Sequence, residues 1–131
     1  MFKQVYTFLL MELGVYVYHR FIHIVKFKFH KEHHNSNDKI IKDDVVSSVV
    51  IMTNLFIWKL MYPSFLCTVT YLLHFISTNL VHHMIHSHYL PKSRIINYYR
   101  HVHHIHHKYP NCNYSSVTPM PDLLFGTMRF E

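Results

Sequence analysis

Histidine is the residue type that this sequence uses most unusually, with 15 copies among 131 residues. Most of these copies fall into clusters with the spacing HxxxH or HxxHH. In chain order the clusters are His19/His23, His30/His33/His34, His82/His86 and His103/His106/His107. Residues three or four positions apart lie on one face of a helix, so each cluster would aim its imidazoles in one direction. Imidazole is the commonest metal ligand in proteins, and four such faces together predict a cage for more than one metal ion.

The ligand types limit the choice of metal. The chain has only seven acidic residues, and none forms the Glu-x-x-His pair that is typical of soluble di-iron bundles. A site of many neutral imidazoles suits iron, zinc or copper. Zinc would serve hydrolysis and iron would serve oxygen activation, and the ligands alone do not decide between them.

Four polar residues near the clusters are candidates for a supporting shell or for extra ligands. Glu12 precedes His19 by seven residues, on the same helix face, where a carboxylate could accept the second N–H of a ligand histidine. Asn79 shares the face of His82 and His86 and is assigned a similar role. His83 and His104 lie about 80 to 100° around their helices from the ligand faces, which makes them weaker candidates.

Two further ionisable residues are interpreted without metal. His74 falls inside an apolar segment, where it is either a functional group or a neutral histidine bonded to a backbone carbonyl. Asp122 is expected to be structural and to cap a loop that closes the chain. Cys67 and Cys112 are isolated and form no disulfide framework, so both are expected to be reduced.

Hydropathy indicates a membrane hairpin. Mean hydropathy is only +0.03, yet Lys59 is the only formal charge between Val45 and Pro91. That stretch is long enough for two crossings of about 20 residues each. With a break at Tyr62-Pro63-Ser64, the two crossings are Val45 to Met61 and Ser64 to His86, which places the hairpin at about residues 45–87.

Basic residues flank this hairpin on one side. Eleven of the thirteen Lys and Arg residues lie between Arg20 and Lys42 or between Lys92 and Arg129, and positive residues collect on the cytoplasmic side of membranes. Two crossings return the chain to its starting side, so all four clusters can meet at one membrane face. The net charge of +6 also invites a nucleic-acid role, but no nucleic-acid module signature is present and the cations are scattered singly.

The sequence therefore predicts one all-α integral membrane domain over residues 1–131, with histidine clusters at 19–34 and 82–107. Helices are expected at Tyr6 to Ile24, at Phe29 to His34 and at Ser93 to His107, besides the hairpin. The turn-forming residues 35–38 should end the second helix. The tail, with two prolines after residue 118, is expected to be an ordered loop.

The order of these motifs resembles the fatty acid hydroxylase/sterol desaturase superfamily, a group of membrane-bound non-haem di-iron oxidases. The resemblance runs from His19 to Thr127. His19-Arg-Phe-Ile-His23 is similar to the HRxxH box of that family, and His30-Lys-Glu-His33-His34 is similar to its HKxHH box. The pair His82/His86 and the segment from Tyr99 to His107 resemble its later boxes, and Asp122-Leu-Leu-Phe-Gly-Thr127 resembles its D-x-x-FGT ending.

The resemblance implies an oxygen-dependent enzyme that holds two irons on the ten clustered histidines, with zinc as a substitute metal. Dioxygen would be the co-substrate, and hydrogen would be taken from a fatty acyl chain or a sterol, giving hydroxylation or desaturation. Electrons would arrive through cytochrome b5 and its reductase. The expected location is the endoplasmic reticulum, with the histidine boxes facing the cytosol.

Two departures keep alternatives open. Family members carry more membrane helices before the first box, whereas about eighteen residues precede His19, and the interval from His23 to His30 is short. A minimal enzyme, a homo-oligomer that borrows helices and a degenerate, non-catalytic metal-binding membrane protein all remain. A desaturase of the related three-box type is disfavoured, because that family separates its first two boxes more widely. The sequence does not encode the lipid substrate.

Overall fold

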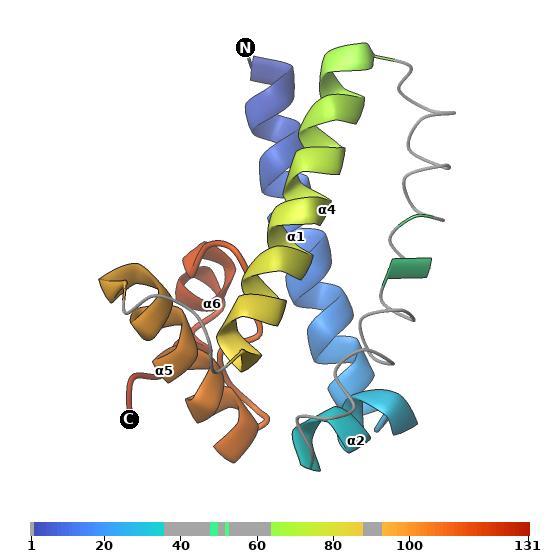
Figure 1. Cartoon of the computed structure of the whole chain (residues 1–131). Helices are drawn as coiled ribbons and strands as arrows, with labels where there is room; N and C mark the ends of the chain where they lie inside the picture. The colour runs from blue at the N-terminus through green and yellow to red at the C-terminus, as the bar shows by residue number, and fades with distance from the viewer. Residues whose placement is uncertain (1, 36–47, 50–51, 53–63, 88–92) are drawn as a thin grey trace.

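The computed structural model describes residues 2–35, 48–49, 52, 64–87 and 93–131, and in that part of the chain the regular structure is helical, with no strand (Figure 1). The elements are α1 (Phe2–Ile24), α2 (Lys28–Asn35), α4 (Phe65–His86), α5 (Arg94–Lys108) and α6 (Met120–Leu124). The all-α prediction is confirmed, and α1, α2 and α5 match the helices expected from the sequence to within a few residues.

The two long helices, α1 and α4, lie side by side and run in the same direction (Figure 1). Thr7 and Glu12 of α1 and Cys67, Tyr71 and His74 of α4 are buried, and Glu12 bonds His74 between the two helices. Because the directions agree, the C-terminal ends of both helices lie at the same end of the molecule. These ends carry the histidine pairs of α1 and α4.

A sharp turn after α1 sets the direction of α2. Lys26 adopts a left-handed conformation with φ of 53°, its N–H donates to the carbonyl of His23, and the N–H of Phe27 donates to the carbonyl of Ile22. These two bonds form a Schellman motif, which satisfies the last carbonyls of a helix and ends it. The next helix, α2, is consequently bent by 88° from α1 and lies across the end of the molecule (Figure 1).

Arg100 ties α5 to the end of α4. Its guanidinium donates to the carbonyls of Met84, Ile85 and Ser87 at 3.3, 3.3 and 2.5 Å. Carbonyls at the C-terminus of a helix have no partner within the helix, and a nearby cation is favourable for them. Arg100 therefore holds the histidine face of α5 beside that of α4.

The C-terminal tail is more regular than the sequence suggested. The tail was expected to be a loop, but it contains the short helix α6, because Pro121 occupies the first turn, where its missing N–H costs nothing. The helix ends in a second Schellman motif, in which Thr127 N–H donates to the carbonyl of Asp122 at 2.8 Å. Gly126 has a φ of +66° there, which explains why this position is a glycine.

The apolar surface of the long helices fits a bilayer. α4 is long and apolar enough to cross a membrane by itself, whereas α1 and α2 reach that standard only when the bent pair is taken together. Large apolar side chains on both long helices are exposed, including Leu9, Leu13, Val17, Phe21, Leu66, Leu73, Ile76 and Leu80. The predicted first crossing lies almost entirely outside the described residues, so the hairpin and the side of the membrane that it faces remain predictions.

Candidate metal centre

All ten clustered histidines converge at one end of the molecule, and nine of them form two groups. Site A consists of His19, His23, His30, His34 and His106, and site B consists of His33, His86, His103 and His107. In each group the ligand nitrogens lie within 4.8 Å of one another. His82, the tenth, packs its ring against three members of site B, with centroid distances of 5.0 to 5.1 Å to His33, His86 and His103.

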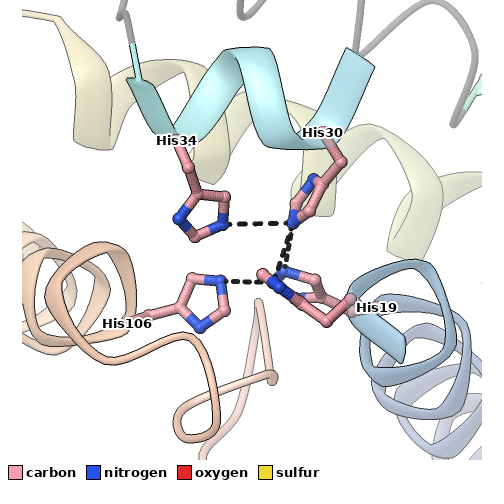
Figure 2. Close-up of side chains that lie close together, drawn as sticks. His19, His30, His34 and His106 are labelled. Carbon is pink, nitrogen blue, oxygen red and sulfur yellow. Dashed lines mark hydrogen bonds between the residues drawn. The ribbon is translucent and has the colours of Figure 1, made fainter. Parts of the chain in front are cut away.

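The imidazoles of site A point their Nε2 atoms toward a common centre (Figure 2). His30 Nε2 lies 3.2 Å from His19 Nε2, 2.9 Å from His23 Nε2 and 3.2 Å from His34 Nε2. His106 closes the group at 3.1 Å from His23 Nε2. Nitrogens bound at about 2.0–2.1 Å to one ion would be separated by roughly 3.0–3.4 Å, so this spacing is close to that of a shared coordination shell.

Two backbone carbonyls fix the tautomers in site A. The Nδ1 atom of His19 lies 2.7 Å from the carbonyl oxygen of Tyr114, and that of His106 lies 2.7 Å from the carbonyl oxygen of Cys112. A carbonyl can only accept, so both Nδ1 atoms carry the hydrogen and the neutral rings present bare Nε2 lone pairs. These lone pairs face other imidazole nitrogens at about 3 Å, where a cation would bind them favourably. The donor set fits a metal ion.

Site B gives independent support for a metal. His103 Nε2 lies 2.8 Å from His86 Nε2 and 2.9 Å from His107 Nε2. His33 is fully buried, and among the residues that the structure describes neither of its ring nitrogens has a hydrogen-bond partner. A buried polar group without a partner costs roughly 1–3 kcal/mol, and such a group in a native site calls for an explanation such as a bound ion.

The helices divide the histidines between the sites in a regular way. α1 contributes only to site A and α4 only to site B, whereas α2 and α5 contribute to both. In α2, His30 and His34 serve site A while His33 serves site B; in α5, His103 and His107 serve site B while His106 serves site A. The i and i+4 members of each HxxHH motif thus share one ion site, and the intervening histidine reaches the other.

Burial favours the neutral form of three α5 imidazoles, those of His103, His106 and His107. Desolvation, followed by the charges that His82 and His106 would contribute, lowers the pKa of His103 well below its usual value of 6.5. Desolvation and then His34 lower the pKa of His106 well below that value and the pKa of His107 to about 2. The neutral ring is the form that binds a metal, so these ligands are ready at physiological pH.

The loop after α5 is a part of the site that sequence reasoning missed. It supplies the carbonyls of Cys112 and Tyr114, and the ring of Tyr114 packs against those of His19, His23 and His106. Because every residue has a backbone carbonyl, the sequence does not show which carbonyls bond the histidines. The turn-forming residues after Pro110 indicate only that a loop follows α5. Asp122 binds this loop, which agrees with the structural role predicted for it.

The structure places Glu12 away from the histidine sites, so the predicted role as a partner of His19 is wrong. Its Oε1 lies 2.5 Å from His74 Nε2, and its Oε2 accepts from the backbone N–H, at 2.9 Å, and the hydroxyl of Thr118. Seven residues of helix are about 10 Å, which a glutamate side chain does not bridge. His74 is buried with Glu12 and does not bond a backbone carbonyl as its alternative interpretation supposed.

The remaining polar candidates lie outside both sites. His83 and His104 are exposed and belong to neither group, because their positions on α4 and α5 point them away from the ligand faces. Asn79 donates to the carbonyl of Phe75 at 2.9 Å and accepts from Ser48 at 3.5 Å. It lines a cavity together with His82, and its supporting role stays a prediction.

That cavity, of about 80 Å³, opens beside both sites. Four of the histidines form part of its wall, namely His19, His30, His82 and His103. Apolar side chains from three helices form much of the rest, including Val15, Ile22, Ile85 and Val102. A group held in this cavity would lie against aliphatic side chains and imidazoles, and also near the polar groups of Thr78, Asn79 and Ser115.

Comparison with known proteins identifies the family. A model of the family described as fatty acid hydroxylase matches residues 4–127, which is nearly the whole chain. The chain belongs to the fatty acid hydroxylase family. No curated protein and no solved structure matches it significantly.

Membership of the fatty acid hydroxylase family agrees with the geometry. The family is one of membrane-associated, metal-dependent oxidoreductases that act on lipids, and this chain has a helix that could span a membrane and histidine groups that could hold metal. The matched region also contains all ten clustered histidines and, in the described part of the chain, every helix except the first two residues of α1. The family resemblance inferred from the four histidine motifs is therefore confirmed.

Proposed function

We propose that this protein is a non-haem di-iron oxidase that uses dioxygen to hydroxylate or desaturate a lipid at the membrane. The observation that carries the proposal is the pair of adjacent histidine sites bordering one apolar-walled cavity. Site A would hold one ion and site B the other. Two irons, when bound, would supply the activation of dioxygen that attack on an unactivated C–H bond requires.

The chain's own residues have two tasks in this scheme. The imidazoles would hold the ions in a buried environment that lowers the pKa of His103, His106 and His107 and so favours their neutral form. The aliphatic side chains of the cavity bind a hydrocarbon segment and exclude water, since burial of apolar surface is favourable by about 25 cal/mol per Å². Val15 and Ile22 of α1, Ile85 of α4 and Val102 of α5 all line this space, and together with the family they support a fatty acyl chain or a sterol as the substrate.

Electrons must come from outside the chain. Hydroxylation of R–H consumes one dioxygen, two electrons and two protons, and yields R–OH and one water. We assign the electron supply to a cytochrome b5 and reductase system. The cationic flanks of the apolar segment support a cytosolic orientation for the histidine face in the endoplasmic reticulum, where such donors could dock.

The test combines metal content with lipid products. The protein is expressed in a eukaryotic host that makes both acyl lipids and sterols, then purified in mild detergent, and iron and zinc are counted per chain. The host's lipids are analysed after exposure to ¹⁸O₂. The double variant His33→Ala/His106→Ala, which damages both sites, is the control. The proposal predicts about two irons per chain and an ¹⁸O-labelled or newly unsaturated lipid, both absent from the control.

Other outcomes separate the alternatives. Tightly bound zinc with no oxygen consumption would identify a metal-binding membrane protein without oxidase activity. A folded protein with no stoichiometric metal would refute the assignment of both sites as metal sites. Metal bound at two per chain, with a substrate other than an acyl chain or a sterol, would retain the centre and change only the substrate class.

A further inference from the structure

Asp122 is one of the most buried polar residues of the chain, with 1% of its surface exposed. Its Oδ1 accepts from the backbone N–H of Tyr114 at 2.9 Å and from the hydroxyl of Thr127 at 2.6 Å. Its Oδ2 accepts from the backbone N–H of Ser115 at 2.7 Å, and the hydroxyl of Ser115 accepts from the N–H of Asp122. A carboxylate with three donors forms strong, charge-assisted bonds, so it fixes the peptide planes of this loop.

The loop that Asp122 fixes is the one that orients two ligands of site A. The carbonyl of Tyr114 belongs to the residue whose N–H the carboxylate binds, and this carbonyl accepts from His19 Nδ1. The carbonyl of Cys112, two residues earlier, accepts from His106 Nδ1. Between them, Asn113 holds a left-handed φ of 54° and bonds Arg129 and Val102 through its amide.

Site B has no corresponding support in the described part of the chain. Both ring nitrogens of His33 lack a hydrogen-bond partner there, and the hydrogen bonds of His86, His103 and His107 join their Nε2 atoms to one another. The two sites consequently differ in what holds their ligands. Two of the five histidines of site A are bonded to the C-terminal loop, whereas no such bond to a histidine of site B is seen in the described residues.

We propose that Asp122 is a positioning residue for site A. It acts through the carbonyls of Tyr114 and Cys112, which orient His19 and His106. Its loss weakens metal binding at site A while site B keeps its ion. The inference rests on the proposed function only in requiring that both sites bind metal. Partners of ligand histidines commonly contribute 10–100-fold to metal affinity, so a loss of that size is expected at one site of the two.

The experiment titrates the full-length apoprotein in detergent with Co²⁺, whose visible absorption reports coordination by histidine. Wild type should bind two Co²⁺ per chain, and Asp122→Asn should bind one with unchanged affinity and the other 10–100-fold more weakly. Glu12→Gln is the matched control, because it also converts a buried carboxylate that bonds the C-terminal segment, through Thr118, but it touches neither site. That control should retain both affinities.

Double variants assign the weakened site. In a His30→Ala background, which already lacks site A, Asp122→Asn should cause no further change in Co²⁺ binding. In a His33→Ala background, which lacks site B, it should weaken the one remaining ion by the full factor. Non-additivity of this kind identifies residues that act on the same site, and general destabilisation does not produce it.

A second pair of variants covers the case in which Asp122→Asn does not fold. Thr127→Val removes one donor to Asp122, and Thr127→Ser keeps it. The valine variant should weaken one Co²⁺ site by a smaller factor, and the serine variant should restore it. Equal weakening of both sites in the Asp122 or Thr127 variants, or no weakening at all, would overturn this inference alone. A wild type that binds no Co²⁺ would overturn the two-metal centre and this inference with it.

Discussion

Sites A and B use the same ligand type but are built differently. Site A draws its five histidines from α1, α2 and α5, and the loop after α5 fixes two of them by their Nδ1 atoms. Site B draws four histidines from α2, α4 and α5, and contains the fully buried His33, whose ring nitrogens have no hydrogen-bond partner in the described part of the chain. The comparison shows that two sites built from the same ligand type can differ in preorganisation, because backbone carbonyls orient two imidazoles of site A and the packing of helices positions those of site B.

The largest effect is expected when one histidine of each site is removed from the same helix, which tests whether sites A and B are separate. His30 and His33 are three residues apart in α2 but belong to different sites. His30→Ala should empty site A and His33→Ala should empty site B, and each should lower lipid oxidation by more than the roughly 100-fold that loss of an outer partner costs. Metal content and the Co²⁺ spectrum of each variant provide the measurement.

The two spectra must differ for the division into sites to hold. Identical spectra, with the same ion lost in both variants, would mean that the ten histidines form one shared cluster. Glu32, which lies between the two ligands on α2 and belongs to neither site, offers Glu32→Gln as a control in the same helix. Its metal content should equal that of wild type.

The next largest effect is expected on lipid oxidation when the cavity beside both sites is filled. Ile85 lines this cavity from α4, and Ile85→Trp should fill much of the space next to His82 and His103. Overpacking costs typically 1–3 kcal/mol of stability, while displacement of a substrate by about 1 Å can cost about 100-fold in rate. The expected result is a large loss of lipid oxidation with two metals still bound.

Ile85→Val provides the conservative comparison, because it enlarges the cavity by one methylene without blocking it. It should alter which chain position is oxidised more than it alters the rate. If Ile85→Trp oxidises the same lipid at the wild-type rate, the substrate reaches the metal centre by another route.

Acidification should act on both sites together through α5. In the unfolded chain histidine titrates near pH 6.5, whereas burial holds the pKa of His107 at about 2 and those of His103 and His106 well below their usual value. The unfolded state therefore binds more protons below pH 6.5, so the free energy of unfolding of the apoprotein should fall as the pH falls from 7.5 to 5.5.

Denaturant titration of the apoprotein at several pH values measures this slope. His107→Gln removes one of the depressed groups and should make the decline with acid shallower. Metal release should follow the same direction, because protons compete with ions for the imidazoles. A stability that rises on acidification would contradict the buried, neutral state of these rings.

Helical spacing in the sequence gathered the ten histidines that the structure brings to one end of the molecule, but it did not predict their division into two groups. Periodicity alone placed His30, His33 and His34 on one face, but helical spacing does not say which neighbouring helix each imidazole will meet. An 88° bend between α1 and α2 turns α2 across the bundle and thereby decides which site each of its histidines joins. The bend occurs at Lys26, which has a left-handed φ but is not a glycine, so nothing in the sequence indicates it.

The sequence analysis assigned Glu12 the wrong partner and missed two backbone carbonyls of site A. Glu12 shares the face of His19 on a helical wheel, yet two helical turns separate them along the axis, and the carboxylate meets His74 of α4 instead. The Tyr114 and Cys112 carbonyls were missed because main-chain groups are the same at every residue. Only Asp122, the one acidic side chain in that segment before the final Glu131, gave a sign that the loop is fixed.

The smallest effect is expected at the two histidines that neighbour the ligands but face outward. His83 and His104 are exposed on α4 and α5, beside His82 and His103 in sequence. His83→Ala and His104→Ala should change the free energy of unfolding by no more than about 0.5 kcal/mol, as is usual for surface substitutions. Metal content and lipid oxidation should equal those of wild type. Loss of an ion in either variant would show that the ligand shell extends beyond the ten histidines. The description of site A or of site B would then have to include His83 or His104 as a further ligand.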